Sequence, residues 1–336
     1  MAFNILEIEP HVVSGSLEGK SFLIYGGVKT GKTTIASKFP NALLLAFEKG
    51  YNMIEGIRAQ PIHSWSEARQ AKSQLLSHMR DYTNGKIDQL MYKTVVVDTA
   101  DLAWEQCVKS ILTAYNVTDL TDIPYGKGHK LAHQEYQDFF VELVKAGFTI
   151  VAISHSTTKS LKDAVTGKDY EYTCPSLEKR PFNILTGMAD IVGHTERVAQ
   201  EDGTEQTMLR LRGNKLTEAG SRNPYSSEFI PFTYEALMKD MEKAVQQMND
   251  GAPLPESNPY KETSKEDFKE VRRQIASWAK ELQTKGQGDR YQKLIYKYLG
   301  DGVGVKDCTE DQLDVLIIIR DDLKALIEEL GIEVAA

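Results

Sequence analysis

The sequence predicts an α/β fold with a mostly parallel central sheet, followed by a small C-terminal domain made of α-helices. Short apolar runs alternate with amphipathic stretches, and buried strands separated by helices are typical of parallel sheets. A proline-rich stretch, Asn249–Thr263, then interrupts the pattern, and the apolar residues after it recur at helical spacing. We therefore expect a core domain at residues 1–248, a linker at 249–263 and a helical domain at 264–336.

The expected elements of the core domain begin with a strand, a glycine-rich turn and a helix. The first strand is Ser21–Tyr25, and the helix is expected at Thr33–Phe39. Apolar runs predict three further strands, and the four apolar residues that recur at helical spacing near residue 140 predict one further helix. Toward the end of the domain, a run that alternates apolar and basic residues is typical of an antiparallel strand. These later elements are Ala42–Phe47, Thr94–Val97, Leu131–Val144, Phe148–Ile153 and Met208–Leu211.

Two helix starts are expected in the C-terminal domain. At Ser264–Asp267 and at Thr309–Gln312, a hydroxyl residue is followed three positions later by an acid or an amide. The second of these patterns precedes an amphipathic apolar series that runs from Leu313 to Leu330. This segment therefore reads as a small helical satellite domain.

Composition excludes several classes of protein. Lys and Arg number 40 and Asp and Glu number 48, which gives a net charge of -8. This balance excludes binding of nucleic acid by bulk positive charge, although it permits a local basic groove. The longest apolar runs are far shorter than the ~20 residues that cross a bilayer, and the N-terminus lacks a basic start, so we expect no membrane partner and no signal peptide. Cys107, Cys174 and Cys308 form no C-x-x-C pair, which suits a reducing cytoplasm.

The glycine-rich turn after the first strand matches the phosphate-binding pattern G-x-x-x-x-G-K-[ST] in full. The N–H groups of such a loop surround phosphate oxygens, and the following helix adds its positive end. We expect Lys32 to reach the β- and γ-phosphates of ATP and the Thr33 hydroxyl to ligate Mg²⁺. A chance glycine turn is the alternative, but it explains neither the strand before the motif nor the helix after it. The expected ATP-binding residues are Gly26, Gly27, Val28, Lys29, Thr30, Gly31, Lys32, Thr33 and Thr34.

Three polar residues that end apolar runs are candidates for the chemistry. Asp98 ends a buried valine run and is expected to hold Mg²⁺ together with Thr33, or else to cap the next helix. Glu48 follows the second strand and is expected to polarise the attacking water, or else to be a surface acid. His155 follows the fourth strand, where it would sense the γ-phosphate or be a structural histidine with satisfied partners.

The order of these features resembles the RecA-type ATPase core. Over roughly residues 15–245 the chain is similar, more specifically, to phage-encoded RecA-like AAA ATPases of recombination and replication modules, some of which are single-strand annealing recombinases. The passages that carry this similarity are Pro124–Lys130, Ala152–His155, Arg180-Pro181 and Ala189–Val192. The resemblance implies a RecA-like P-loop NTPase core that uses ATP and Mg²⁺.

The resemblance also implies ATP-dependent binding to single-stranded DNA through two loops, expected at Ile123–Lys130 and Ser156–Arg180. Basic side chains in such loops neutralise phosphates, and interleaved aromatic rings such as Tyr170 and Tyr172 stack on bases. For any single lysine, solvated surface charge is the alternative. The candidate DNA-binding residues are Lys127, His129, Lys130, Lys159, Lys162 and Lys168, with Lys179 and Arg180 at the end of the second loop.

RecA-type ATPases hydrolyse ATP at subunit interfaces, so the resemblance implies a homo-oligomer, either filament or ring, in which a neighbour supplies positive charge. Family members carry such residues on and after a late strand, which here holds Arg210, Arg212, Lys215 and Arg222. For each of them alone, a surface charge is the alternative. Of these, Arg212 and Lys215 join Lys32, Glu48, Asp98 and His155 as the expected catalytic residues.

The chain departs from bacterial RecA in two places. The fourth strand ends in Ser-His where RecA has Asn-Gln. The tail after the linker has no clear match, and three roles stay open for it: to bind a single-stranded DNA-binding protein, to cap the oligomer or to contact DNA. Two other functions therefore stay open. One is a hexameric replicative helicase-like motor or loader, and the other is a regulatory binding module that uses nucleotide as a switch.

Overall fold

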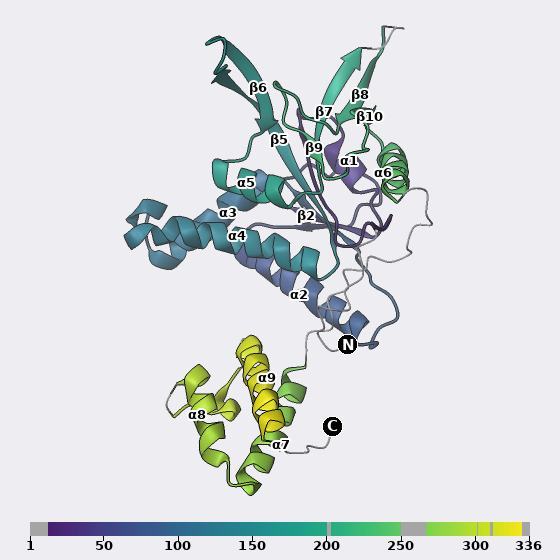
Figure 1. The fold of residues 1–336 in the computed structure, drawn as a ribbon. Helices are drawn as coiled ribbons and strands as arrows, with labels where there is room; N and C mark the ends of the chain where they lie inside the picture. The colour runs from purple at the N-terminus through teal and green to yellow at the C-terminus, as the bar shows by residue number, and fades with distance from the viewer. Residues whose placement is uncertain (1–12, 200–202, 250–266, 301, 310–311, 331–336) are drawn as a thin grey trace. The chain divides into compact units, whose positions relative to one another are not determined.

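The chain forms two compact units, Met1–Lys261 and Glu262–Ala336 (Figure 1). Each unit has its own hydrophobic core. The computed structural model describes residues 13–199, 203–249, 267–300, 302–309 and 312–330. The predicted α/β fold class is confirmed, because a mostly parallel sheet organises the first unit and the second is helical. Most of the expected linker, Asn249–Thr263, lies outside the described residues.

The central sheet places its strands in the order β10-β8-β7-β1-β5-β4-β2-β3. All neighbours from β7 to β3 are parallel, whereas β8, β9 and β10 join as antiparallel strands, as expected for Met208–Leu211. The carboxyl ends of the parallel strands therefore share one edge of the sheet, where ligands bind in open α/β folds. The strands are β1 Ser21–Gly26, β2 Ala42–Ala46, β3 Ala59–Pro61, β4 Thr94–Asp98, β5 Thr149–Lys162, β6 Asp169–Pro175, β7 Ile191–Ala199, β8 Glu205–Arg210, β9 Gly220–Ser221 and β10 Phe229–Pro231.

Helices cover both faces of this sheet (Figure 1). Side chains of α2 to α5 share one core with Leu23 and Tyr25 of β1, while side chains of α1 and α6 share the other core with Phe22 and Ile24. Both cores can use β1 because successive side chains of a strand point to opposite faces. The helices are α1 Lys32–Ala36, α2 Trp65–Thr83, α3 Ala100–Tyr115, α4 Lys127–Lys145, α5 Lys179–Met188 and α6 Tyr234–Met248, with 3₁₀ turns η2 Leu120–Asp122 and η3 Pro124–Gly126.

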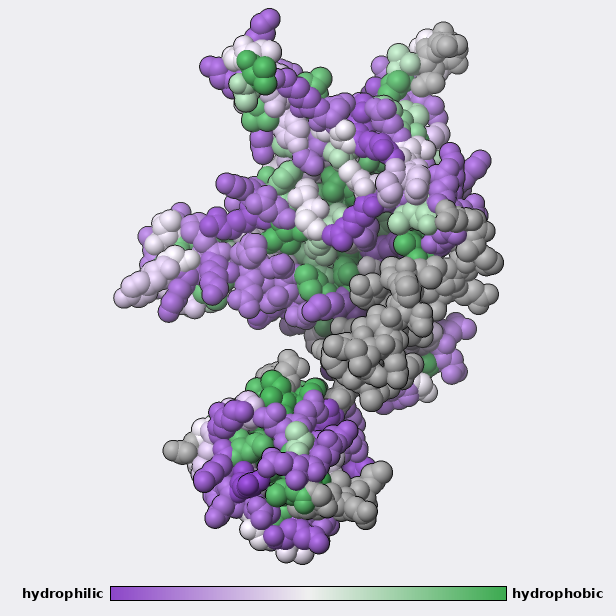
Figure 2. All heavy atoms as spheres, in the orientation of Figure 1, coloured by the Kyte–Doolittle hydropathy of each residue, from purple (hydrophilic) through white to green (hydrophobic). Residues whose placement is uncertain are grey.

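The fourth predicted strand is longer than expected, and this corrects the prediction of a basic loop at Ser156–Arg180. β5 continues past Ile153 to Lys162 and pairs with β6, from Ser156 opposite Pro175 to Lys162 opposite Asp169. Threonines on both strands and the two tyrosines of β6 favour this pairing. The result is a β-hairpin that projects from the sheet (Figure 1), and hydrophilic side chains make up most of its visible surface (Figure 2).

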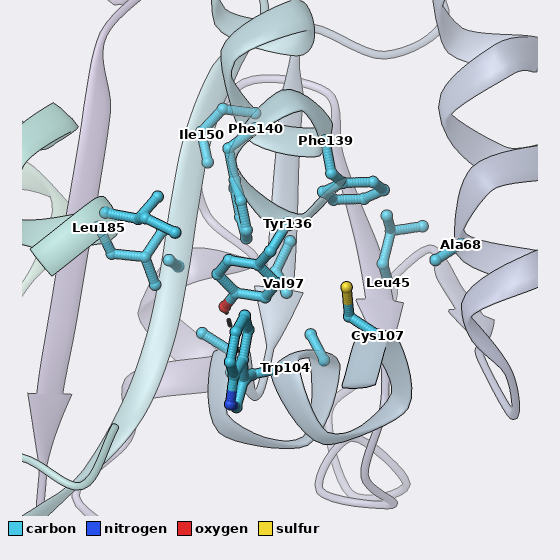
Figure 3. Close-up of a cluster of buried hydrophobic side chains, with 14 of the residues drawn as sticks. Leu45, Ala68, Val97, Trp104, Cys107, Tyr136, Phe139, Phe140, Ile150 and Leu185 are labelled. Atoms are coloured by element: carbon cyan, nitrogen blue, oxygen red, sulfur yellow. Dashed lines mark hydrogen bonds between the residues drawn. The ribbon is translucent and has the colours of Figure 1, made fainter. Parts of the chain in front are cut away.

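Aromatic side chains of α3 and α4 fill the first core (Figure 3). The ring centroid of Tyr136 lies 5.0 Å from that of Phe140 and 5.3 Å from that of Trp104. The Tyr136 hydroxyl donates a hydrogen bond of 2.8 Å to the carbonyl oxygen of Ala100, so this buried polar group is satisfied. The contact ties the first turn of α3, which directly follows β4, to the rigid interior of the unit.

The helical unit contains α7 Phe268–Thr284, α8 Gly288–Leu299 and α9 Leu313–Glu329, with a 3₁₀ turn η4 at Val305–Asp307. Asp267 caps α7 by accepting a hydrogen bond from the Lys269 N–H, and the expected cap Ser264 lies outside the described residues. The expected cap Thr309 is wrong, because Gln312 directly precedes α9. The Gln312 side chain nevertheless accepts a hydrogen bond from the Thr309 N–H, as a capping pair does.

Candidate nucleotide-binding site

The glycine-rich motif forms the connection between β1 and α1, as the sequence predicts. Gly26 ends β1 beside β7, and a Cβ atom there would lie 1.9 Å from the Thr195 hydroxyl oxygen. Gly31 has a positive φ of 90° just before α1, a conformation that costs glycine nothing. The Thr30 hydroxyl oxygen lies 3.0 Å from that of Thr195. The loop is therefore fixed against the middle of β7, a role for Thr195 that the sequence does not signal.

Lys32 is buried at the start of α1, with 6% of its surface exposed. Its ammonium group donates hydrogen bonds to the carbonyl oxygens of Gly26, at 3.0 Å, and Gly27, at 2.7 Å. Burial lowers the pKa of Lys32, and the nearby carboxylates of Asp98 and Glu48 oppose this shift. The lysine is thus held inside the curl of the loop, where its charge suits an anionic ligand.

Thr33 and Asp98 meet across the carboxyl edge of the sheet. The Thr33 hydroxyl donates a hydrogen bond of 2.7 Å to Oδ2 of Asp98, which is only 2% exposed. Oδ1 of Asp98 is buried and has no hydrogen-bond partner among the described residues. Burial raises the pKa of this carboxyl, while the Thr33 hydrogen bond and Lys32 oppose the rise. A hydroxyl oxygen beside a carboxylate with a spare oxygen fits Mg²⁺, which prefers hard oxygen ligands.

The alternative role for Asp98, as a helix cap, does not hold. The cap of α3 is Thr99, whose hydroxyl accepts a hydrogen bond of 3.5 Å from the Leu102 N–H. The peptide bond between Asp98 and Thr99 is cis. Asp98 is thus the last residue of β4, and its side chain is directed to Thr33.

Glu48 and His155 form a second pair beside the first. Oε2 of Glu48, which follows β2, lies 3.5 Å from Nε2 of His155 on β5. A Cβ atom built on Gly50 would lie 3.3 Å from Oε1 of Glu48 and 4.0 Å from the Thr33 hydroxyl oxygen, so Glu48 lies close to Thr33. Nδ1 of His155 is buried without a partner in the described part of the chain, unlike that of a satisfied structural histidine. The structure therefore brings together Lys32, Thr33, Glu48, Asp98 and His155.

Within the described ranges, Arg212 and Lys215 contact other parts of the chain and not the nucleotide site. Arg212 donates hydrogen bonds to the carbonyl oxygens of Ser226, at 2.7 Å, and Pro224. Lys215 forms an ion pair with Asp163 near the tip of the hairpin, and its ammonium lies 4.8 Å from the centre of the Tyr170 ring. Arg210 pairs with Glu196 and Glu228, and Arg222 bonds the carbonyls of Gly187 and Met188. All four basic side chains hold segments of their own chain together.

Most of the candidate DNA-binding residues lie on helix α4 or strand β5, not on two loops. Lys127, His129 and Lys130 belong to the first turns of α4, which begins four residues before the expected start. Lys159 and Lys162 lie on β5, and Lys168 precedes β6 in the turn of the hairpin. The side chains of the five lysines are exposed, and that of His129 is half-buried.

Two aromatic rings accompany these lysines. The ammonium of Lys127 lies 6.0 Å from the centre of the Tyr125 ring, and that of Lys159 lies 5.7 Å from the centre of the Phe182 ring. Of the two tyrosines expected to stack on bases, Tyr172 instead donates its hydroxyl to Glu218, which limits its freedom. Burial and this neighbouring acid raise the pKa of Tyr172.

Comparison with known proteins assigns the domain that contains this site to a family. The profile of the AAA domain family matches residues 18–223, more than half of the 336-residue chain. The chain belongs to the AAA domain family. The AAA domain contains the glycine-rich loop, the Thr33–Asp98 and Glu48–His155 pairs and the β5–β6 hairpin, and it is an ATPase-type domain. Strand β10, helix α6 and the helical unit follow it.

A relative extends the similarity beyond the AAA domain. Over 98% of its length the chain is 29% identical to YorG, an SPbeta prophage-derived uncharacterized protein of Bacillus subtilis strain 168, and the alignment covers all of YorG. The alignment therefore also includes most of the segment that forms the helical unit of this chain. Among the helices that the structure describes, none has the length and apolar character of a membrane span.

Proposed function

We propose that this protein is a phage-type, RecA-like ATPase that binds ATP with Mg²⁺ at the AAA domain and assembles on single-stranded DNA as a recombinase or annealing protein. The observation that carries the proposal is the Thr33–Asp98 hydrogen bond beside buried Lys32 and the Glu48–His155 pair. These groups lie on or directly after four neighbouring strands, β1, β5, β4 and β2, and converge on one edge of the sheet, as a phosphate-transfer site requires.

Each residue has a distinct task in this proposal. Lys32 exchanges its bonds to the loop carbonyls for phosphate oxygens, and the Thr33 hydroxyl and Asp98 hold the metal. The bound ion neutralises charge on the phosphates. Glu48 accepts a proton from the attacking water, and His155, 3.5 Å away, holds the Glu48 carboxylate in place.

The DNA-binding part of the proposal is supported by charge distribution. The chain has a net charge of -8, yet exposed lysines gather at the start of α4 and on the hairpin. Basic groups on projecting elements neutralise phosphates while an acidic body discourages unspecific binding. The prophage origin of YorG agrees with a phage-type protein.

One experiment separates the candidate functions. ATP turnover and negative-stain electron microscopy are carried out with the full chain, with and without single-stranded DNA. We expect Mg²⁺-dependent turnover that DNA stimulates, and filaments or rings that form on DNA. Strand annealing without unwinding supports the recombinase, whereas ATP-driven unwinding supports a helicase-like motor. Nucleotide binding without turnover would support the regulatory binding module and would contradict the proposed ATPase.

A further inference from the structure

Asp101 lies in the first turn of α3, three residues after Asp98, and bonds two hydroxyl groups from other elements. Its Oδ1 atom accepts hydrogen bonds from Ser154 of β5, at 3.2 Å, and from Ser176, which follows β6. Hydrogen bonds to a charged carboxylate are stronger than those between neutral groups. A single oxygen atom therefore holds both strands of the hairpin at its root.

The root of the hairpin is also where His155 is fixed. The Ser176 N–H donates a hydrogen bond of 2.9 Å to the carbonyl oxygen of His155, and the Ser154 hydroxyl lies 3.1 Å from the same oxygen. Ser154 is fully buried, so its hydroxyl depends on these protein partners. A contiguous chain of hydrogen bonds thus runs from α3 through the hairpin root to the backbone of His155, whose ring reaches Glu48.

The other carboxylate oxygen of Asp101 accepts no hydrogen bond from the part of the chain that the structure describes. Oδ2 is buried and has no hydrogen-bond partner among the described residues, and the same holds for Nε1 of Trp104, one turn further along α3. A buried polar atom without a partner costs free energy, and natural structures contain few. Oδ2 can therefore accept hydrogen bonds from partners other than Ser154 and Ser176. A residue that only anchors a loop does not need such a second set of partners.

We propose that Asp101 is a positioning residue that couples the nucleotide site to the β5–β6 hairpin. Nucleotide and metal bound at Asp98 would shift the start of α3, and Asp101 would carry that shift through Ser154 and Ser176 to the hairpin and His155. The inference rests on the proposed function for the nucleotide site, but it does not require that the hairpin binds DNA.

Hydrogen exchange of the hairpin, residues 156–175, tests the coupling in the full chain, with and without Mg²⁺ and a non-hydrolysable ATP analogue. Binding of the analogue is measured separately by titration. In the wild-type protein we expect the analogue to slow exchange at the hairpin root by about fivefold or more, the range typical of coupled sites. In Asp101→Ala we expect this response to vanish while affinity for the analogue changes by less than about threefold.

Three further variants make the result specific to the carboxylate oxygen. Asp101→Asn should keep most of the response, because its amide oxygen can accept from both serine hydroxyls. Ser176→Ala, at an exposed position, should weaken the response even if Asp101→Ala fails to fold. Glu105→Ala, an exposed acid on the same helix, should respond like the wild-type protein.

The possible failures are distinguishable. A wild-type protein that binds the analogue without any change in hairpin exchange would overturn the coupling alone. A normal response in both Asp101→Ala and Ser176→Ala would also overturn it. A wild-type protein that does not bind the analogue would overturn the proposed nucleotide site and, with it, this inference.

Discussion

The Thr33 hydroxyl donates a hydrogen bond of 2.7 Å to the Asp98 carboxylate, and this contact joins the start of α1 to the end of β4. β5 lies between β1 and β4 in the sheet, so the bond spans the strand that continues into the hairpin. Asp98 keeps one buried oxygen without a partner among the described residues, next to Lys32. The Lys32 ammonium and the Asp98 carboxylate thus provide a positive and a negative group at one site, for phosphate and for metal respectively.

Lys32→Ala should lower nucleotide affinity by about 100-fold or more, because a buried ammonium loses its bonds to phosphate and each such charged hydrogen bond contributes about 1.5–3 kcal/mol. Fluorescent-nucleotide titration measures the loss, and thermal unfolding should remain cooperative. Lys38→Ala, at an exposed position just after α1, is the matched control and should bind normally. Unchanged affinity in Lys32→Ala would show that the loop does not hold phosphate.

Glu48→Gln should reduce ATP turnover by about 10²–10⁴-fold, the usual contribution of a positioned general base, with nucleotide affinity nearly unchanged. The amide keeps the size of the side chain but cannot accept the proton. Phosphate release under saturating ATP provides the measurement, and Glu55→Gln, on the exposed segment after Glu48, is the control. Equal turnover in Glu48→Gln and the wild-type protein would show that Glu48 is not the general base.

Charge reversal of Lys127 and Lys130 to Glu should weaken binding to single-stranded DNA and flatten its dependence on salt. Each neutralised phosphate contributes about 0.7 to the logarithmic salt slope for single strands, so loss of two contacts should lower the slope by about 1.4. Fluorescence anisotropy over a range of salt concentrations measures both effects. Lys243→Glu, exposed on α6, controls for net charge. An unchanged slope would show that the start of α4 does not contact the phosphates of the DNA.

His194→Phe should make the stability of the AAA domain less sensitive to acid. His194 is 9% exposed and packs on Tyr25 at 4.7 Å, and burial lowers its pKa. Below its unfolded pKa of about 6.5 the unfolded chain binds a proton that the folded chain does not, so the free energy of unfolding falls as the pH falls. Phenylalanine keeps a ring against Tyr25 and removes this proton uptake.

Urea unfolding between pH 7.5 and 5 tests this prediction. The wild-type protein and the control His63→Phe, at an exposed position, should lose stability in parallel as the pH decreases. His194→Phe should show a shallower loss, whatever its stability at neutral pH. A parallel loss in all three proteins would mean that His194 is protonated equally in the folded and unfolded chains.

The nucleotide site is predictable from the sequence because strong local signals surround it. β1 and β4 each extend only one residue beyond the predicted strands, at Gly26 and Asp98, since their apolar runs end in polar or glycine residues. In contrast, α2 is polar over most of its length, so apolar periodicity does not reveal it. Its start does carry a local signal, because Ser64 accepts a hydrogen bond from the Glu67 N–H and the Glu67 side chain accepts one from the His63 N–H.

Other features depend on contacts between distant parts of the chain. The outer half of β5 has no apolar run, and it becomes a strand because β6 pairs with it. Likewise, Asp101 looks like an ordinary acid in the first turn of a helix. Its bonds to Ser154 and Ser176 require the hairpin root to lie beside α3, which no local pattern indicates. The roles of Arg212 and Lys215 in a neighbouring subunit stay predictions.

The two outermost strands of the central sheet, β3 and β10, are three residues long and both end in proline, Pro61 and Pro231. Proline has no N–H group to donate, and short outer strands offer few free backbone groups. Neither side of the sheet is thus a good template for an added strand, which protects the protein from aggregation by strand addition. Copies that assemble as proposed would then join through surfaces other than these two edges, where association can be reversible and can respond to nucleotide.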